Sequence, residues 1–88
     1  MRIVFDRDGW EDYLYFQRGE AAVLRRLNAL IAECMRDPFR GIGKPEPLKE
    51  EYQGWWSRRV NQEHRVIYRV TGKAPDQALE IIQCRYHY

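Results

Sequence analysis

The sequence predicts an α+β domain in which two consecutive helices cover one face of a sheet. Residues 20–35 repeat apolar side chains at steps of three and four, which is typical of a helix with one buried stripe. Residues 54–87 instead contain three short β-branched and aromatic segments separated by turn residues, the pattern of strands. A chain of 88 residues has room for one domain, so we expect residues 1–88 to form a single unit.

The elements are expected in the order β-α-α-β-β-β. The expected strands are 2–5, 54–60, 64–70 and 78–87, and the expected helices are 8–17 and 20–35. Asp8 and Glu11 form a capping-box pattern at the start of the first helix, and Pro38 ends the second. Short connections between the last three strands predict an antiparallel meander. The predicted architecture is therefore a two-helix hairpin on a mainly antiparallel, four-stranded sheet.

The middle strand of the meander shows which face of the sheet should be buried. Val66, Tyr68 and Val70 alternate along residues 64–70 and are expected to face the core. The residues between them are expected on a solvent-facing side; they are Arg65, Ile67 and Arg69. The segment 39–51, with two glycines and two prolines, predicts a long loop, and loops of this length in compact domains are often functional.

Composition and charge exclude some classes of function. The net charge is +2, but it is uneven: residues 1–38 hold six Arg and seven acidic residues, and residues 39–88 hold nine Lys or Arg and six acidic residues. This balance is far from that of a protein that coats nucleic acid through charge alone. No stretch approaches the roughly 20 apolar residues of a membrane span, and the N-terminus does not resemble a signal peptide, so we expect a cytoplasmic protein without membrane contact.

The two cysteines are expected to be reduced core residues. Cys34 and Cys84 are too few for a disulfide framework, and neither has a second cysteine or a histidine at metal-ligand spacing. Free cysteine commonly behaves as a small buried hydrophobe. No metal or organic cofactor is therefore expected.

Three kinds of side chain could carry chemistry. Glu46 lies between Pro45 and Pro47, which stiffen the backbone around a candidate general base, although a solvated loop acid is the simpler interpretation. His87 is a candidate proton donor, although a histidine next to the C-terminus is often only solvated. Arg58 and Arg59 point to opposite faces of one expected strand, so only one of them can join Arg65 on a given face.

A carboxylate, an arginine and a histidine are sufficient for cleavage of RNA without a metal. The carboxylate removes the proton of a 2′-hydroxyl, whose oxygen then attacks the adjacent phosphate in line. The guanidinium stabilises charge on the phosphate oxygens, and the histidine protonates the departing 5′-oxygen. The products would be a 2′,3′-cyclic phosphate and a 5′-hydroxyl. DNA lacks the attacking hydroxyl and would not react.

Four motifs make the whole chain resemble YoeB-type toxins of the RelE superfamily. They are GKPEPLK at 43–49, WSRR at 56–59, EHRVIY at 63–68 and CRYHY at 84–88. The early segment WEDYL at 10–14 and the Asp37-Pro38-Phe39 joint are similar too. The resemblance implies a RelE-like fold and a ribosome-dependent endoribonuclease that cuts mRNA in the ribosomal A site.

The resemblance also implies residue roles. Glu46 would act as the base, Arg65 would stabilise the phosphate, and His87 with Tyr88 would supply the acid and its partner. Contacts with RNA or the ribosome are implied for four basic residues: Lys44, Lys49, Arg58 and Arg59. The turn over residues 71–77 is longer than is usual in the family and lies away from the four motifs.

The resemblance implies partners as well. They are a YefM-like antitoxin with an acidic tail, the small ribosomal subunit with its mRNA, and a second copy of the chain in a homodimer. A toxin that has lost its activity is disfavoured because Glu46, Arg65 and His87 are all present, and two further alternatives remain on the residues alone. One is a non-catalytic ribosome or RNA binder that inhibits translation. The other is a DNA-binding repressor, which the broad apolar stripe of the second helix disfavours because a recognition helix would be basic.

Overall fold

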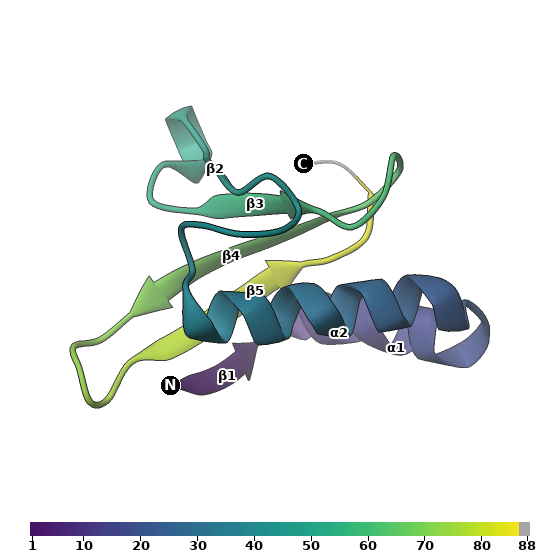
Figure 1. The fold of residues 1–88 in the computed structure, drawn as a ribbon, viewed down its shortest axis with the longest axis horizontal. Coiled ribbons are helices and arrows are strands. Elements are labelled where there is room, and N and C mark those ends of the chain that lie inside the picture. The colour runs from purple at the N-terminus through teal and green to yellow at the C-terminus, as the bar shows by residue number, and fades with distance from the viewer. Residues whose placement is uncertain (87–88) are drawn as a thin grey trace.

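The computed structural model describes residues 1–86 and shows two helices packed on one face of an open sheet (Figure 1). The helices are α1 (Arg7–Gly19) and α2 (Ala21–Arg36), and a short 3-10 helix, η1, spans Glu50–Tyr52. The strands are β1 (Arg2–Phe5), β2 (Glu46–Pro47), β3 (Trp56–Arg59), β4 (Arg65–Thr71) and β5 (Ala78–Gln83). The predicted α+β class is confirmed. Neither described helix is long and apolar enough to cross a membrane.

Within the described residues the sheet has five strands in the order β1-β5-β4-β3-β2, one more than predicted. The meander is confirmed, because β3 pairs antiparallel with β4 and β4 with β5. β1 pairs parallel with β5 at one edge. The additional strand is β2, which pairs antiparallel with β3 at the other edge. Two residues within a proline-rich segment are too few to show the alternation by which strands are recognised.

The start of the first helix and the end of the last strand differ from the prediction. α1 begins at Arg7, because the backbone N–H of Trp10 donates to the carbonyl of Asp6 at 2.9 Å. Asp6 therefore occupies the N-cap and makes no side-chain capping bond, so the predicted capping box at Asp8 does not form. At the other end of the chain, β5 stops at Gln83 rather than continuing to residue 87.

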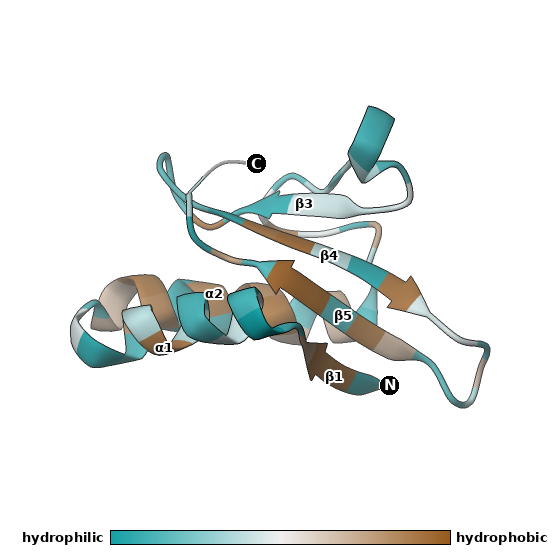
Figure 2. Cartoon of the chain, turned by 180° about the vertical axis from the view of Figure 1, so that it is seen from behind, coloured by the Kyte–Doolittle hydropathy of each residue, from teal (hydrophilic) through white to brown (hydrophobic). Residues whose placement is uncertain are grey.

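The core lies between the helices and the inner face of β4 and β5. Figure 2 shows hydrophobic stretches on both of these strands, which lie beside the helix layer. Phe16 and Leu27 from the helices and Leu79 from β5 are fully buried. Gly9 permits the close packing of α1 on β5, because a Cβ atom there would lie 2.6 Å from the carbonyl oxygen of Ile81.

The prediction of reduced, buried cysteines is confirmed. Cys34 and Cys84 are free thiols in the core. Burial raises the pKa of Cys84 to about 12, so its thiol stays protonated at neutral pH and is a poor nucleophile.

The burial of side chains along β4 agrees with the prediction at two positions and differs from it at a third. Val66 and Tyr68 are buried as expected. Ile67, expected on the solvent-facing side, is also fully buried. It lies in the middle of the sheet, opposite Ser57 on β3 and Gln83 on β5.

A buried arginine joins the sheet to the loop that follows α2. Arg58 on β3 is fully buried and donates to the carbonyl oxygens of three loop residues. The acceptors are Asp37 at 2.5 Å, Arg40 at 2.8 Å and Ile42 at 3.1 Å. A charge this far from water requires such partners, and carbonyl oxygens without a donor would in turn be costly. One guanidinium thus determines the path of the loop.

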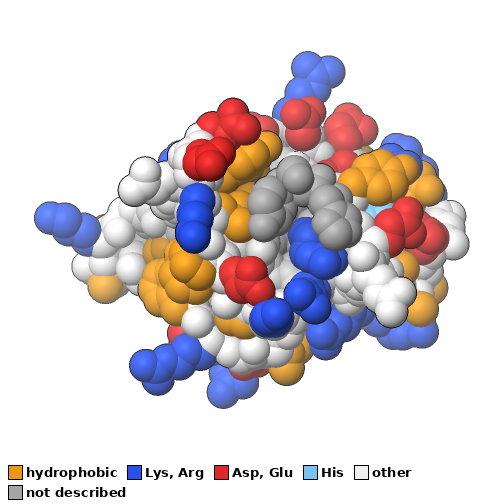
Figure 3. All heavy atoms as spheres, turned by 90° about the horizontal axis from the view of Figure 1, so that it is seen from above, with side chains coloured by type: hydrophobic (Ala, Val, Ile, Leu, Met, Phe, Trp, Pro, Cys, Tyr) orange, Lys and Arg blue, Asp and Glu red, His pale blue; other side chains and the backbone are white. Residues whose placement is uncertain are grey.

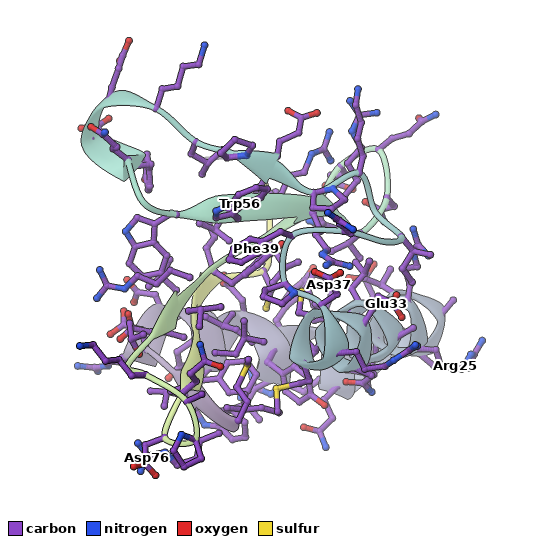
Figure 4. All side chains as sticks on the ribbon, turned by 60° about the vertical axis from the view of Figure 1, so that its left-hand side comes forward. Arg25, Glu33, Asp37, Phe39, Trp56 and Asp76 are labelled. Atoms are coloured by element: carbon purple, nitrogen blue, oxygen red, sulfur yellow. The ribbon has the colours of Figure 1, made fainter. Side chains whose placement is uncertain are left out.

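Three aromatic side chains complete this connection. Arg58 Nε donates to the Tyr68 hydroxyl at 3.1 Å, and that hydroxyl donates to the carbonyl of Pro38 at 2.6 Å. Burial raises the pKa of the Tyr68 phenol, which keeps the donating proton in place. Figure 4 shows Phe39 lying against Trp56 of β3, with ring centroids 4.9 Å apart. The loop is therefore packed on the sheet as well as hydrogen-bonded to it.

Replacing Arg58 by methionine should destabilise the fold strongly. The Arg58→Met variant keeps an unbranched side chain but leaves buried carbonyls without donors, so we expect the free energy of unfolding to fall by about 3 kcal/mol or more. Urea denaturation measures this change. The neighbouring Arg59 is exposed, and Arg59→Met should alter stability by no more than about 1 kcal/mol. Equal losses in the two variants would contradict the structural role of Arg58.

Candidate active site

The pairing of β2, β3 and β4 brings three charged side chains to one face of the sheet. Glu46 of β2 lies opposite Ser57 of β3, and Arg59 of β3 lies opposite Arg65 of β4. Ser57 and Arg59 are two residues apart on one strand, so they share a face. The predicted base, the predicted phosphate-binding arginine and Arg59 therefore project from the same side of three neighbouring strands.

Arg58 lies on the opposite face, which corrects its predicted role. The sequence could show only that Arg58 and Arg59 point in opposite directions, and the register decides which of them joins Arg65. Arg58 has no exposed surface, and its donors are directed at loop carbonyls and the Tyr68 hydroxyl. It is therefore a structural residue rather than a contact for RNA or the ribosome in this conformation.

Glu46 is accessible and lies beside a lysine. Its side chain is 47% exposed, and Oε1 lies 3.5 Å from Nζ of Lys44. Lys44 has a left-handed backbone, with φ of 53°, in the turn that leads into β2. Lys49, two residues beyond β2, lines the same shallow cavity of about 390 Å³ as Glu46. Figure 3 shows Lys and Arg side chains gathered near the middle of the face seen from above.

Arg65 is held over the turn between β3 and β4. Its Nη1 donates to the carbonyls of Asn61 at 2.8 Å and His64 at 3.0 Å. The turn is itself ordered by the Asn61 side chain, whose Oδ1 accepts from the backbone N–H groups of Glu63 and His64. The guanidinium of Arg65 is thus oriented by the backbone of its own hairpin.

The segment after β5 returns to the same hairpin. The backbone N–H of Tyr86 donates to Nδ1 of His64 at 2.8 Å, and the N–H of Arg65 donates to the carbonyl of Tyr86 at 3.0 Å. Two residues earlier, the N–H of Cys84 donates to Oδ2 of Asp12 on α1 at 3.1 Å. Despite this bond, burial raises the pKa of Asp12. These contacts join residues 84–86 to α1 and to β4.

His64 comes directly before β4, and its side chain pairs with that of the adjacent Glu63, with 3.7 Å between Nε2 and Oε1. Its ring is 4% exposed and packs edge-on against Phe16. The bond to Tyr86 was not foreseen, because 22 residues separate the two and no local pattern connects them.

The remaining predicted residues, His87 and Tyr88, lie outside the described residues.

Arg26 is a residue that the sequence did not single out. It reaches from α2 to a second cavity of about 380 Å³ that Arg59 and Arg65 also line. In the sequence Arg26 is only a charged residue off the apolar stripe of a helix, so nothing there distinguishes it from Arg25. Among residues 1–86, no three His, Cys, Asp or Glu side chains gather in a group that could hold a metal ion.

Comparison with known proteins gives consistent relatives over the whole chain. Residues 5–88 match the family described as the YoeB-like toxin of bacterial type II toxin-antitoxin systems. The toxin YoeB of Streptomyces coelicolor is 50% identical over 100% of both chains, and the toxin YoeB of Escherichia coli K12 is 46% identical, also over 100% of both.

Solved structures agree with these sequence relatives. A YoeB/ParE toxin from Agrobacterium tumefaciens superposes with a TM-score of 0.95 and 49% identity over 100% of both chains. A YoeB chain from a heterotetrameric YoeB–YefM toxin–antitoxin complex of Staphylococcus aureus superposes with a TM-score of 0.87 and 39% identity. That match covers 100% of this chain and 98% of the other. The fold, the arrangement of charged residues on β2, β3 and β4, and the full-length similarity lead to one conclusion: the chain belongs to the YoeB-like toxin family.

Proposed function

We propose that this chain is a ribosome-dependent endoribonuclease that cleaves mRNA in the ribosomal A site and thereby inhibits translation. The observation that carries the proposal is the common face of Glu46, Arg59 and Arg65 on three adjacent strands. The hydrogen bond from Arg65 N–H to the Tyr86 carbonyl supports it further, because the next residue in the chain is His87. In this proposal the base and the phosphate-binding arginine lie on one face of the sheet, and the residue before the acid is bonded to that arginine's backbone.

In the proposed reaction Glu46 removes the proton of the 2′-hydroxyl, and that oxygen attacks the adjacent phosphorus. The bond to the departing 5′-oxygen breaks as His87 protonates it, with Tyr88 as the partner of His87. Arg65 carries the charge that develops on the phosphate oxygens. The products are a 2′,3′-cyclic phosphate and a 5′-hydroxyl. All the groups in this scheme are protein side chains, so no metal ion or organic cofactor is required.

The proposed partners follow from the relatives. YoeB of Staphylococcus aureus is known both as a dimer and in complexes with YefM. We therefore propose that a YefM-like antitoxin neutralises this toxin and that two copies of the chain associate. In the proposed cytoplasmic setting, Lys44, Lys49 and Arg59 would contact mRNA or ribosomal RNA.

Mapping of 5′ ends on a defined mRNA tests the proposed activity. Purified toxin should produce a cut within the A-site codon when programmed ribosomes are present, and the 5′ end should carry a hydroxyl group. His87→Ala should reduce cleavage by at least about 100-fold, because the leaving oxygen loses its proton donor. Ribosome binding without any cut would instead indicate a non-catalytic inhibitor of translation.

The role of Arg65 can be separated from its charge. Arg65→Lys keeps the positive charge but loses the planar fork, so we expect the rate constant for cleavage to fall by about 100-fold. Arg69→Lys is a matched control, since Arg69 lies on the same strand but pairs with Glu80 of β5, with 2.5 Å between Arg69 Nε and Glu80 Oε1. Single-turnover cleavage on programmed ribosomes measures both. A full rate in Arg65→Lys would rule out a bidentate contact with the phosphate.

His64 should affect cleavage through the position of the C-terminal segment. In His64→Asn the side-chain oxygen can replace Nδ1 as acceptor for Tyr86 N–H, whereas His64→Leu fills similar space without an acceptor. We expect His64→Leu to lower the single-turnover rate by about 10- to 100-fold and His64→Asn to restore most of it. Thermal unfolding of both variants provides the control. Equal rates in the two variants, at equal stability, would exclude this positioning role.

A further inference from the structure

The cavity at the end of the β3–β4 hairpin collects positive charge from three elements. Arg26 comes from α2, Arg59 from β3 and Arg65 from β4, and all three line a space of about 380 Å³. The other described residues of its wall are Val60, Asn61 and Gln62. None of the described lining residues is acidic, so the wall itself provides no counter-charge.

The pairing of two of these arginines is unfavourable without an anion. Arg59 and Arg65 lie directly opposite one another across an antiparallel pair, and like charges in that arrangement reduce stability. Elsewhere in the same sheet the corresponding position is compensated, because Arg69 on β4 lies opposite Glu80 on β5 and is paired with it. The contrast indicates that the Arg59–Arg65 pair is arranged for a negatively charged ligand.

A hydrogen bond directs the Arg26 side chain toward this cavity. Its Nε donates to the carbonyl of Val60 at 3.3 Å, which holds the side chain against the end of the hairpin. Arg25, the preceding residue on α2, does not line the cavity, and Figure 4 shows it pointing outward from the helix. Two neighbouring arginines of one helix thus have different environments.

We propose that this cavity binds a backbone phosphate of the mRNA next to the phosphate that is cut, and that Arg26 and Arg59 are its ligands. The inference rests on the proposed function, which assigns Arg65 to the scissile phosphate. Arg65 lines the same cavity as Arg26 and Arg59, so a strand whose scissile phosphate contacts Arg65 would place a neighbouring phosphate within reach of the other two arginines. Guanidinium groups suit phosphate oxygens, and Asn61, whose Oδ1 is used within the turn, has an amide NH₂ group that can donate to a phosphate or sugar oxygen.

The test measures binding to ribosomes programmed with an mRNA that carries 2′-deoxy nucleotides in the A site and so resists cleavage. Arg26→Gln should weaken binding about tenfold and lower the slope of log K against log salt by about one. Arg26→Lys should restore most of both effects. Arg25→Gln removes the same charge one residue away and should leave the affinity within about twofold.

A neutral methylphosphonate placed at single A-site positions identifies the phosphate. At one position next to the cut, this substitution should weaken binding of the unmodified protein but cause little further loss in Arg26→Gln, as expected for two groups in direct contact. Additive losses at every position, or equal effects of Arg25→Gln and Arg26→Gln, would overturn the proposal. The proposal would also be overturned if Arg26→Gln lost affinity for the acidic tail of the antitoxin and not for the mRNA, because the cavity would then bind a peptide.

Failure of this inference is distinguishable from failure of the proposed function. Binding to the uncleavable mRNA does not require catalysis, so a chain that binds and shows the Arg26 coupling but does not cut ordinary mRNA would refute only the nuclease proposal. A chain that cuts at the full rate in Arg26→Gln, with unchanged affinity, would refute only the phosphate site.

Discussion

Burial of the Arg58 guanidinium is the constraint on which the arrangement of the site depends. A charge without exposed surface must have its donors occupied, and here the acceptors are carbonyl oxygens of the loop that follows α2. The loop is thereby held against β3, and the chain that leaves it forms β2 at the edge of the sheet. The carboxylate of Glu46 reaches its position because an arginine twelve residues later in the chain orders the segment before it.

Strand register then divides the charges between two faces. Of the consecutive arginines on β3, one faces the helices and stabilises the fold, and the other shares a face with Glu46 and Arg65. The inner face provides hydrogen bonds for its one buried charge. The outer face instead places two arginines opposite each other. Selection for stability alone would place an acidic residue opposite one of these arginines, as Glu80 lies opposite Arg69.

The end of the described chain is joined to the same hairpin by backbone bonds. Tyr86 adopts a left-handed conformation, with φ of 63°, which is uncommon for a residue with a side chain. Its N–H and carbonyl are both used, by His64 and Arg65 respectively. A conformation of this kind persists when the surroundings determine it, and here they connect the C-terminal segment to the strand that carries Arg65.

The sequence by itself was sufficient for the class of fold, the helix pair, the meander, the reduced cysteines and the family, because periodicity and contiguous motifs are local properties of the chain. It also showed that Arg58 and Arg59 must separate. Only the tertiary structure decided which of the two is buried and that Glu46 belongs to the additional strand β2. It alone also showed that His64 bonds to Tyr86 and that Arg26 shares a cavity with Arg65. Each of these depends on strand register or on contacts between distant segments, and a one-residue change of register would exchange the two faces.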